Sequence, residues 1–508
     1  MKNINLVCGV LLAISVISCK QKNSADGDHY KYEKISWKSC SYNQQNDHKV
    51  TSSKGNEIPL DCSLPDTTPY ECGTLNVPLD WDDIHGKKIA LSLKRVKASK
   101  QDKRIGTLIS IGGGPGAPSL DFFKKIYFSA DWELKDKFDH FSYDPRGIGN
   151  SAPLSCFQDI EKISPFIPKS EEQFLLLQKN VQELRQSCVD KSGNLLNYIN
   201  TESVVKDLEA IRVALNEDKI TLYGVSYGTA VVATYAHRYP NNTRALVLDG
   251  VLDRSLALEE IVKNDISALK TVYDKFLDYC ENNPKCGLSR KEINEILSNL
   301  KNEYHYNLNG EEKVLTKSEI LFIISYNLSS ESRWDNIASN LIAFKEINPP
   351  FKINNIFDFS YNKFRSVAIP YYAVTCADYP KFNINWDKYS QLRKIANDIL
   401  PIFDGNINIL QTVGVCSGWE NSASKPLLTE HKVTIPQKAL LVSSENDANT
   451  PHINAKLKQK QIEGSQILES KDVKHGLFLS SSADKCLNNS VTQFLLNASY
   501  SNINLNCK

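Results

Sequence analysis

One pentapeptide constrains the fold of this chain more than any other feature. Residues 224–228 have the sequence G-V-S-Y-G and lie between a short apolar stretch, 220–223, and an apolar helical pattern, 227–238. Between a strand and a helix, G-x-S-x-G makes a turn so sharp that the serine backbone is strained, and the glycines avoid Cβ clashes. The Ser226 hydroxyl would then lie beside the positive end of the helix dipole, which favours developing negative charge. The pattern predicts a nucleophilic serine; a tight structural turn is the alternative.

The order of the other expected elements indicates a sheet wrapped by helices. Strands are expected at 74–77, 89–96, 107–111, 138–143 and 245–248, and a helix at 203–215. A mostly helical stretch follows, with clear periodicity at 266–280 and 293–300, before strands return at 438–444 and 466–469 with helices at 453–461 and 482–496. We therefore predict an α/β fold with a mostly parallel sheet flanked by helices, a core in residues 37–255 and 431–508, and a large helical lid inserted at 256–430.

A serine nucleophile needs a general base, and the base needs a carboxylate that orients it. Around a G-x-S-x-G serine between a strand and a helix, the acid and then the histidine follow the serine along the chain. Asp447 follows the expected strand 438–444, and His475 follows the strand 466–469. Both are therefore expected at the end of the sheet that carries Ser226. The sequence predicts a catalytic triad of Ser226, His475 and Asp447.

Three other histidines are expected to be structural. His140 lies in a predicted strand, His237 lies in the helix after the serine and faces away from it, and His452 opens a helix.

An oxyanion hole requires two N–H donors. One is expected from Tyr227, the residue after the nucleophile, and the other from the loop G-G-G-P-G at 112–116, which follows a predicted strand. We expect Gly114 to donate, with Gly113 as the next candidate. A phosphate-binding loop is the alternative, but no G-K-[ST] follows and Pro115 has no N–H.

The first residues predict export rather than part of the fold. Lys2 precedes the apolar run 6–17, which is too short to span a bilayer. The run ends in V-I-S-C, which resembles the lipobox of bacterial lipoproteins and implies lipidation at Cys19. We expect a signal peptide at 1–18, a polar tether at 19–36, and an exported lipoprotein anchored to a membrane of the cell envelope, periplasmic or at the cell surface. An ordinary signal peptide followed by an unmodified cysteine is the alternative.

The cysteines and the net charge limit which disulfides, cofactors and partners can be expected. Of 13 cysteines, 11 remain without Cys8 and Cys19, which allows five disulfides and one free thiol in an exported chain. No C-x-x-C pair is present, so we predict neither a zinc ribbon nor a thioredoxin-like site, and we expect no metal and no cofactor. The formal net charge is +1, which gives no reason to expect nucleic acid as a partner.

Several motifs together resemble one family. The chain resembles the proline iminopeptidase-like branch of α/β-hydrolases in G-G-G-P-G, Y-D-P-R-G-I-G-N-S, G-V-S-Y-G-T-A, D-A-N-T-P and K-H-G. It is more similar to the secreted tripeptidyl aminopeptidases with a TAP-like C-terminal domain, in W-K-S-C, E-C-G-T-L-N-V-P-L-D-W, C-A-D and C-S-G-W, from Trp37 onward. Gly112 stands where iminopeptidases often have histidine, and Ser444 stands where glycine is common. Both departures weaken the transfer of a strict proline preference to this chain.

The resemblance implies an exopeptidase that removes short peptides or single residues from the free N-termini of peptide substrates. It also implies five disulfides, with Cys62 left over: Cys40–Cys72, Cys156–Cys188, Cys280–Cys286, Cys376–Cys416 and Cys486–Cys507.

An aminopeptidase must bind the free α-ammonium group of its substrate. A buried lid carboxylate would serve, since charge-assisted pairing is strong where water is excluded. Asp378 is the candidate, and a turn or capping role is its alternative.

Arg146 is expected to form a structural ion pair, in a turn, 144–147, that supports the glycine loop. The same triad would also serve a carboxylesterase or lipase, and a binding protein without catalysis could keep the same scaffold.

Overall fold

The computed structural model describes residues 33–40, 70–156, 163, 166–308, 311–345, 355–420, 427, 438–480, 484–505 and 507. The expected signal peptide, Cys19 and Cys62 lie outside these residues, as does most of the expected tether. Within them, no helix combines the length and the apolar character that crossing a membrane requires.

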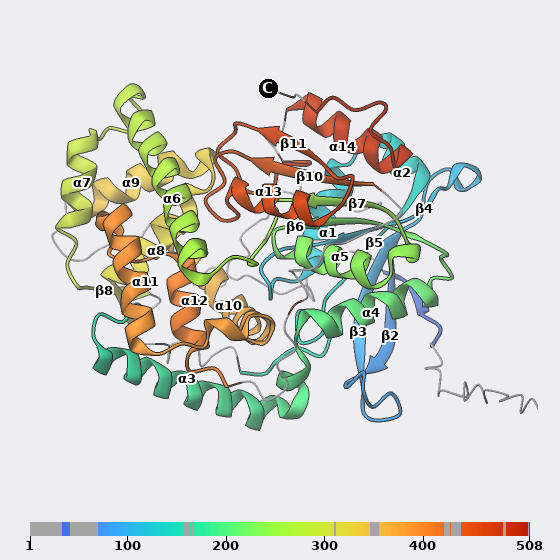
Figure 1. Ribbon diagram of the computed structural model, residues 1–508, viewed down its shortest axis with the longest axis horizontal. Coiled ribbons are helices and arrows are strands. Elements are labelled where there is room, and N and C mark those ends of the chain that lie inside the picture. Colours follow the sequence, from blue (N-terminus) through green and yellow to red (C-terminus); the bar gives the residue numbers. More distant parts are fainter. Residues whose placement is uncertain are drawn as a thin grey trace, which may run out of the picture. The chain divides into compact units, whose positions relative to one another are not determined.

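A nine-stranded sheet forms the core, in the order β1-β2-β3-β5-β4-β6-β7-β10-β11 (Figure 1). The strands β1, β2 and β3 pair antiparallel, and every pair from β5 to β11 is parallel. Their bounds are β1 Ser36–Cys40, β2 Tyr70–Pro78, β3 Lys88–Val96, β4 Gly106–Ile111, β5 Phe138–Tyr143, β6 Ile220–Val225, β7 Thr243–Asp249, β10 Ala439–Ser444 and β11 Gln466–Ser470. This arrangement confirms the predicted α/β-hydrolase fold.

Helices cover both faces of the sheet, which explains why every residue of β4, β5 and β10 is buried. Along β10, Leu441 belongs to the core under one face, whereas Leu440 and Val442 belong to the core under the other. One face is covered by α4 (Thr201–Ala214), α5 (Tyr227–Arg238) and α13 (His452–Gln461), and the other by α1 (Ser119–Ser129), α2 (Trp132–Lys137) and α14 (Lys485–Asn497). Strand β5 and helix α5 have the bounds that the sequence predicted.

The lid between β7 and β10 is mainly helical. Its helices are α6 Leu258–Asn282, α7 Arg290–Ser298, α8 Lys317–Leu328, α9 Trp334–Lys345, α10 Asn355–Asp378, α11 Trp386–Ile399 and α12 Asn408–Cys416. It also contains a hairpin of β8 (Glu303–Leu308) and β9 (Glu311–Thr316), within a stretch whose sequence predicted mostly helix.

Helix α3 (Glu171–Ser192) departs from the predicted division into core and lid. It belongs to the stretch assigned to the core, yet it packs against α12 of the lid. The amide Nε2 of Gln178 donates to the carbonyl of Ser417 at 3.0 Å, and Leu177 packs beside Gly414. The segment between β5 and α4 therefore packs against the lid through α3.

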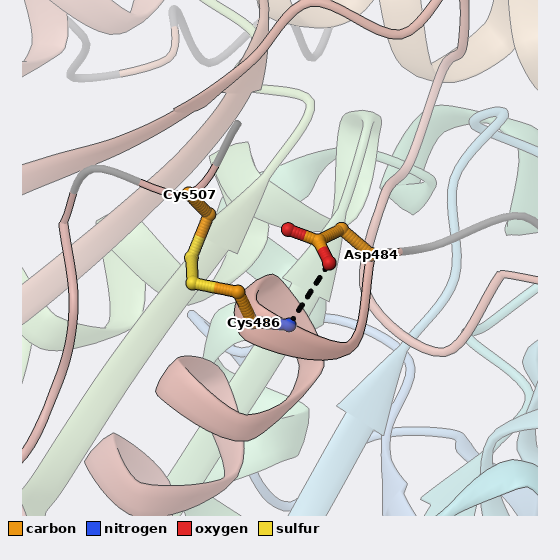
Figure 2. Close-up of side chains that lie close together, drawn as sticks. All are labelled: Asp484, Cys486 and Cys507. Carbon is orange, nitrogen blue, oxygen red and sulfur yellow. Dashed lines mark hydrogen bonds between the residues drawn. A yellow bond between two sulfur atoms is a disulfide. The ribbon is translucent and has the colours of Figure 1, made fainter.

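The five disulfides that the family resemblance implied are present. They are Cys40–Cys72, Cys156–Cys188, Cys280–Cys286, Cys376–Cys416 and Cys486–Cys507. Cys376–Cys416 joins the lid helices α10 and α12, and Cys486–Cys507 holds the C-terminal tail to α14. Asp484 lies beside the latter bridge and accepts the N–H of Cys486 at 3.1 Å, as Figure 2 shows. Both sulfurs form the disulfide and are not available as thiolate ligands for a metal. Asp484 instead caps the N-terminus of α14.

Candidate active site

Ser226 lies in the turn between β6 and α5 with φ 56° and ψ −123°. A non-glycine residue holds such a conformation only where its surroundings fix it. The Ser226 N–H donates to the carbonyl of Asp249 at 2.9 Å, and the Ser226 carbonyl accepts the N–H and hydroxyl of Thr229 at 2.9 and 2.6 Å. The end of β7 and the first turn of α5 thus hold the strained serine in place.

The two glycines of the pentapeptide are required by close packing. A Cβ on Gly224 would lie 2.5 Å from the carbonyl oxygen of Gly228, and a Cβ on Gly228 would lie 2.3 Å from that of Ile111. Strand β6, helix α5 and strand β4 approach too closely for any side chain at these positions.

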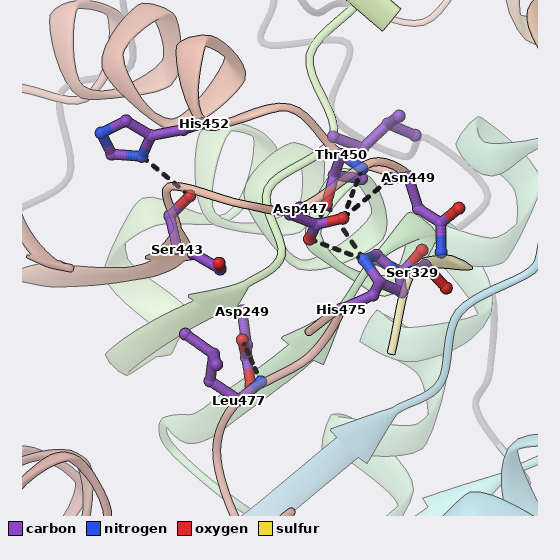
Figure 3. Close-up of polar contacts among 12 residues, drawn as sticks. Asp249, Ser329, Ser443, Asp447, Asn449, Thr450, His452, His475 and Leu477 are labelled. Atoms are coloured by element: carbon purple, nitrogen blue, oxygen red, sulfur yellow. Dashed lines mark hydrogen bonds and ion pairs between the residues drawn. The ribbon is translucent and has the colours of Figure 1, made fainter. Parts of the chain in front are cut away.

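His475 and Asp447 form a hydrogen-bonded pair after β11 and β10. Figure 3 shows His475 Nδ1 directed at Asp447 Oδ2, at 2.8 Å. The Asp447 carboxylate is buried and also accepts the N–H groups of Asn449 and Thr450, at 2.8 and 3.0 Å, and the Thr450 hydroxyl at 2.8 Å. These bonds fix the carboxylate, and a proton on Nδ1 leaves Nε2 of His475 free to accept another.

The histidine loop packs on the serine turn. A Cβ on Gly250 would lie 3.2 Å from His475 Cε1, and Gly250 follows the residue whose carbonyl binds the Ser226 N–H. A Cβ on Gly476 would lie 3.0 Å from Cγ2 of Val225, the residue before the serine. The loop that carries His475 therefore packs against the turn that carries Ser226, at the carboxyl ends of the parallel strands.

A second buried carboxylate, Asp249, joins the two halves of this site. It accepts the N–H of Leu477 at 2.9 Å, as Figure 3 shows. It also accepts the N–H of Phe478 at 2.8 Å and the hydroxyl of Tyr223 at 2.9 Å, while its own carbonyl accepts the Ser226 N–H. The sequence predicted only a strand at 245–248, directly before Asp249. Its role depends on a partner 228 residues away, which no local pattern indicates.

The electrostatic surroundings raise the pKa of His475. Burial alone would lower this pKa, but the charge and hydrogen bond of Asp447, together with the charge of Asp249, outweigh burial. Such an environment stabilises the imidazolium that forms when the base takes a proton.

The glycine loop lies against the nucleophile, as an oxyanion donor must. A Cβ on Gly113 would lie 2.7 Å from Ser226 Cβ and 3.1 Å from its Oγ, whereas Gly114, at φ 128°, packs on its own loop. Gly113 is therefore a glycine of this loop that lies next to the nucleophile. Tyr227 is the first residue of α5, so its N–H is among those that no carbonyl of the helix can accept.

The turn after β5 supports this loop. The buried carboxylate of Asp144 accepts the N–H of Leu120, in the first turn of α1, at 3.1 Å, and the N–H of Asn150 at 3.0 Å. Arg146 is fully buried, and its Nε donates to Asp207 of α4 at 2.7 Å. Arg146 is thus a structural ion-pair partner.

Asp378 caps helix α4, which is the alternative role expected for it from the sequence. Its two carboxylate oxygens accept the N–H and the hydroxyl of Thr201, the first residue of α4, at 3.0 and 2.6 Å. Burial raises the pKa of Asp378 to about 7, although the bonds from Thr201 lower it. The side chain links the end of lid helix α10 to the core, and its oxygens are directed at the helix they cap.

Two of the remaining histidines are held by structural contacts. His140 is buried in β5 against Tyr127, and burial lowers its pKa to about 4. His452 bonds Ser443 Oγ through Nδ1 and Glu469 through Nε2, both at 3.0 Å.

A cavity beside the triad is lined from both the core and the lid. Ala448 and Asn449, which follow the catalytic acid directly, form part of its wall. The other lining residues are Arg254, Asp265, Leu269, Phe322, Ser325, Tyr326, Ile407, Asn408 and Ile409. The lid also bonds the segment before His475, since the N–H of Glu331 donates to the carbonyl of Val473 at 3.3 Å. A substrate in this cavity would lie between the lid and the segment that follows Asp447.

Comparisons with known proteins agree with this arrangement. Residues 106–340 match a family model described as alpha/beta hydrolase fold, and residues 403–507 match one described as TAP-like protein. The tripeptidyl aminopeptidase of Streptomyces coelicolor is 27% identical over 465 residues, which cover 87% of this chain and 83% of that protein. The serine protease Hip1 of Mycobacterium tuberculosis is 25% identical over 456 residues, covering 84% and 85%. Carboxylesterase B of the same species is 29% identical over 241 residues, covering 46% and 45%.

Proposed function

Because this chain is a TAP-like α/β-hydrolase, we propose that it is a serine aminopeptidase that releases single residues or short peptides from free N-termini. One observation carries the chemistry: the hydrogen-bonded pair of His475 and Asp447 packs on the strained turn that exposes Ser226. Two relatives with peptidase names cover most of the chain, which favours peptides over other acyl substrates.

The reaction proceeds in two halves. Ser226 Oγ attacks the scissile carbonyl carbon while His475 Nε2 takes the hydroxyl proton, and the N–H groups of Tyr227 and Gly113 hold the oxyanion. The tetrahedral intermediate then expels the amine, which receives the proton from His475 and leaves an ester on Ser226. Water enters, gives a proton to His475 and cleaves the ester by the same steps in reverse. Asp447 keeps the imidazole in the required tautomer throughout.

The amine requirement separates a peptidase from a carboxylesterase. We expect a tripeptidyl-naphthylamide with a free amine to be hydrolysed with a kcat/KM about 100-fold above that of its N-acetylated form, because acetylation removes a buried charge pair. The control is a p-nitrophenyl ester without an amine, which reports the triad alone. Equal kcat/KM for the free and acetylated amides would contradict the aminopeptidase and favour the carboxylesterase, the name that one relative bears.

We further propose that the protein is exported and anchored through lipid on Cys19. The apolar run 6–17, the lipobox-like V-I-S-C and the five disulfides, which persist in oxidising compartments, support this location. In producing cells fed an alkyne-tagged palmitate, the wild-type chain should carry the tag and sediment with membranes, whereas Cys19→Ala should do neither. Tag-free wild-type protein would contradict the anchor.

A further inference from the structure

The cavity beside the triad contains one ion pair. Of the described residues that line it, only Arg254, which follows β7, and Asp265, from lid helix α6, carry charge. The rest of the wall is largely apolar, with Leu269, Phe322 and Ile409 among its members. Charged side chains in an apolar wall destabilise the fold unless they are paired within the protein or bind a ligand.

The pair is not saturated by its own contacts. Nη1 of Arg254 alone donates to both Asp265 oxygens, at 3.0 and 2.9 Å, whereas a full fork would use two nitrogens. Among the described residues, no other side chain bonds the Asp265 carboxylate, and no protein group accepts from Nε or Nη2 of Arg254. Each side chain keeps 12% of its surface exposed, so a ligand in the cavity can reach both.

A neighbouring ion pair shows what a structural pair looks like in this chain. Asp253 accepts from Lys458 Nζ, from the N–H of Ser255 and from Gln461 Nε2, each at 2.9 Å, and its side chain is fully buried. Asp253 does not line the cavity, although it lies close in the sequence to residues that do. The Arg254–Asp265 pair differs because it has unused bonding capacity that faces an open space.

The electrostatics of this pair favour an added cation. Burial raises the pKa of Asp265, Arg254 lowers it, and the negative charge of Asp447 raises it further. The catalytic carboxylate is therefore within electrostatic reach of Asp265. A positive group bound at Asp265 would relieve the repulsion between the two carboxylates, whereas an anion would add to it.

We propose that Asp265 binds the free α-ammonium group of the substrate and that Arg254 donates its remaining N–H groups to the carbonyl of the first substrate residue. This assignment rests on the proposed aminopeptidase function and replaces Asp378 as the recognition residue. It defines the substrates as peptides with an unblocked N-terminus, whose first side chain packs on the apolar wall. Asp265 thus determines specificity and takes no part in the proton transfers at Ser226.

The test compares matched substrates in matched variants. We would measure kcat/KM for a free and an N-acetylated tripeptidyl-naphthylamide in the wild type, in Asp265→Asn and in Asp274→Asn. Asp274 lies on the same helix, paired with Lys270 on an exposed face, and is the control. In Asp265→Asn the value for the free amine should fall about 100-fold, with the acetylated value unchanged, so that the ratio approaches one. Asp274→Asn should keep the wild-type ratio.

A second variant guards against misfolding, because Asp265→Asn leaves a buried guanidinium unpaired. Arg254→Met combined with Asp265→Asn removes both charges and should lose the discrimination equally. Fluorophosphonate labelling of Ser226, which needs no amine, should proceed at the wild-type rate in both variants. A wild-type ratio retained by the variants would overturn the assignment to Asp265. A wild type that does not distinguish the two substrates would instead contradict the proposed function itself.

Discussion

Replacement of Ser226 by alanine is expected to lower kcat by roughly 10⁴-fold or more, because it removes the atom that attacks the substrate. The fold should persist. The strained turn is held by backbone bonds to Asp249 and Thr229, and the Ser226 hydroxyl makes none of the hydrogen bonds found among the described residues. KM should change little, since the lid cavity and the oxyanion donors are intact.

The measurement is turnover of a free tripeptidyl-naphthylamide, with fluorophosphonate labelling of the same samples. Ser267→Ala, on an exposed position of α6, is the control and should keep both activities. Labelling that survives in Ser226→Ala, or a kcat within tenfold of the wild type, would remove Ser226 from the role of nucleophile. Loss of both signals without loss of the folded state would also exclude a scaffold that merely binds.

Asp447→Asn is expected to lower kcat by about 10⁴-fold, because an amide at this position stabilises the wrong tautomer of His475. The carboxylate also stabilises the imidazolium through its hydrogen bond at 2.8 Å.

The pH dependence of activity should also change in Asp447→Asn. Neutral His475 is the active base, and its pKa in the wild type is raised, so activity should rise with pH through a range above that of an ordinary histidine. Without the Asp447 charge the pKa falls, and the acid limb should move to lower pH.

Profiles of kcat/KM against pH for the wild type and Asp447→Asn test both effects. Asp472→Asn, an exposed aspartate in the same histidine loop, is the control and should leave the acid limb in place. An acid limb that does not move in Asp447→Asn would mean that this carboxylate does not set the pKa of the catalytic base.

Sequence patterns predicted the ends of strands and helices correctly where turn residues such as proline coincide with a change in hydrophobic periodicity. Strand β5 ends at Tyr143, directly before Asp144-Pro145, and helix α5 ends at Arg238, shortly before Pro240. Proline cannot continue either element, so it predicts where the element ends. The pairing of His475 with Asp447 could be predicted because parallel strands bring their carboxyl ends to one edge of the sheet. The glycines at 224 and 228 had a steric reason that the structure shows directly.

The lid could not be derived in the same way. The hairpin β8–β9 lies within a stretch of helical periodicity, and α3 joins the lid through contacts with residues about 240 positions later in the chain, such as Gln178 with Ser417. Asp265 and Asp378 both lie in lid helices outside any catalytic motif. Only packing distinguishes the carboxylate that caps α4 from the one that lines the cavity.

The central claim is tested most directly by trapping the acyl-enzyme. A free-amine peptide substrate is mixed with the enzyme, the reaction is quenched in acid within one turnover, and the modified residue is located by mass spectrometry. We predict an ester on Ser226 whose added mass equals one to three N-terminal residues of the substrate, and none in Ser226→Ala. An adduct on another residue would contradict the role of Ser226 as nucleophile. Rapid release of product without any adduct, under conditions that slow deacylation, would contradict the acyl-enzyme itself.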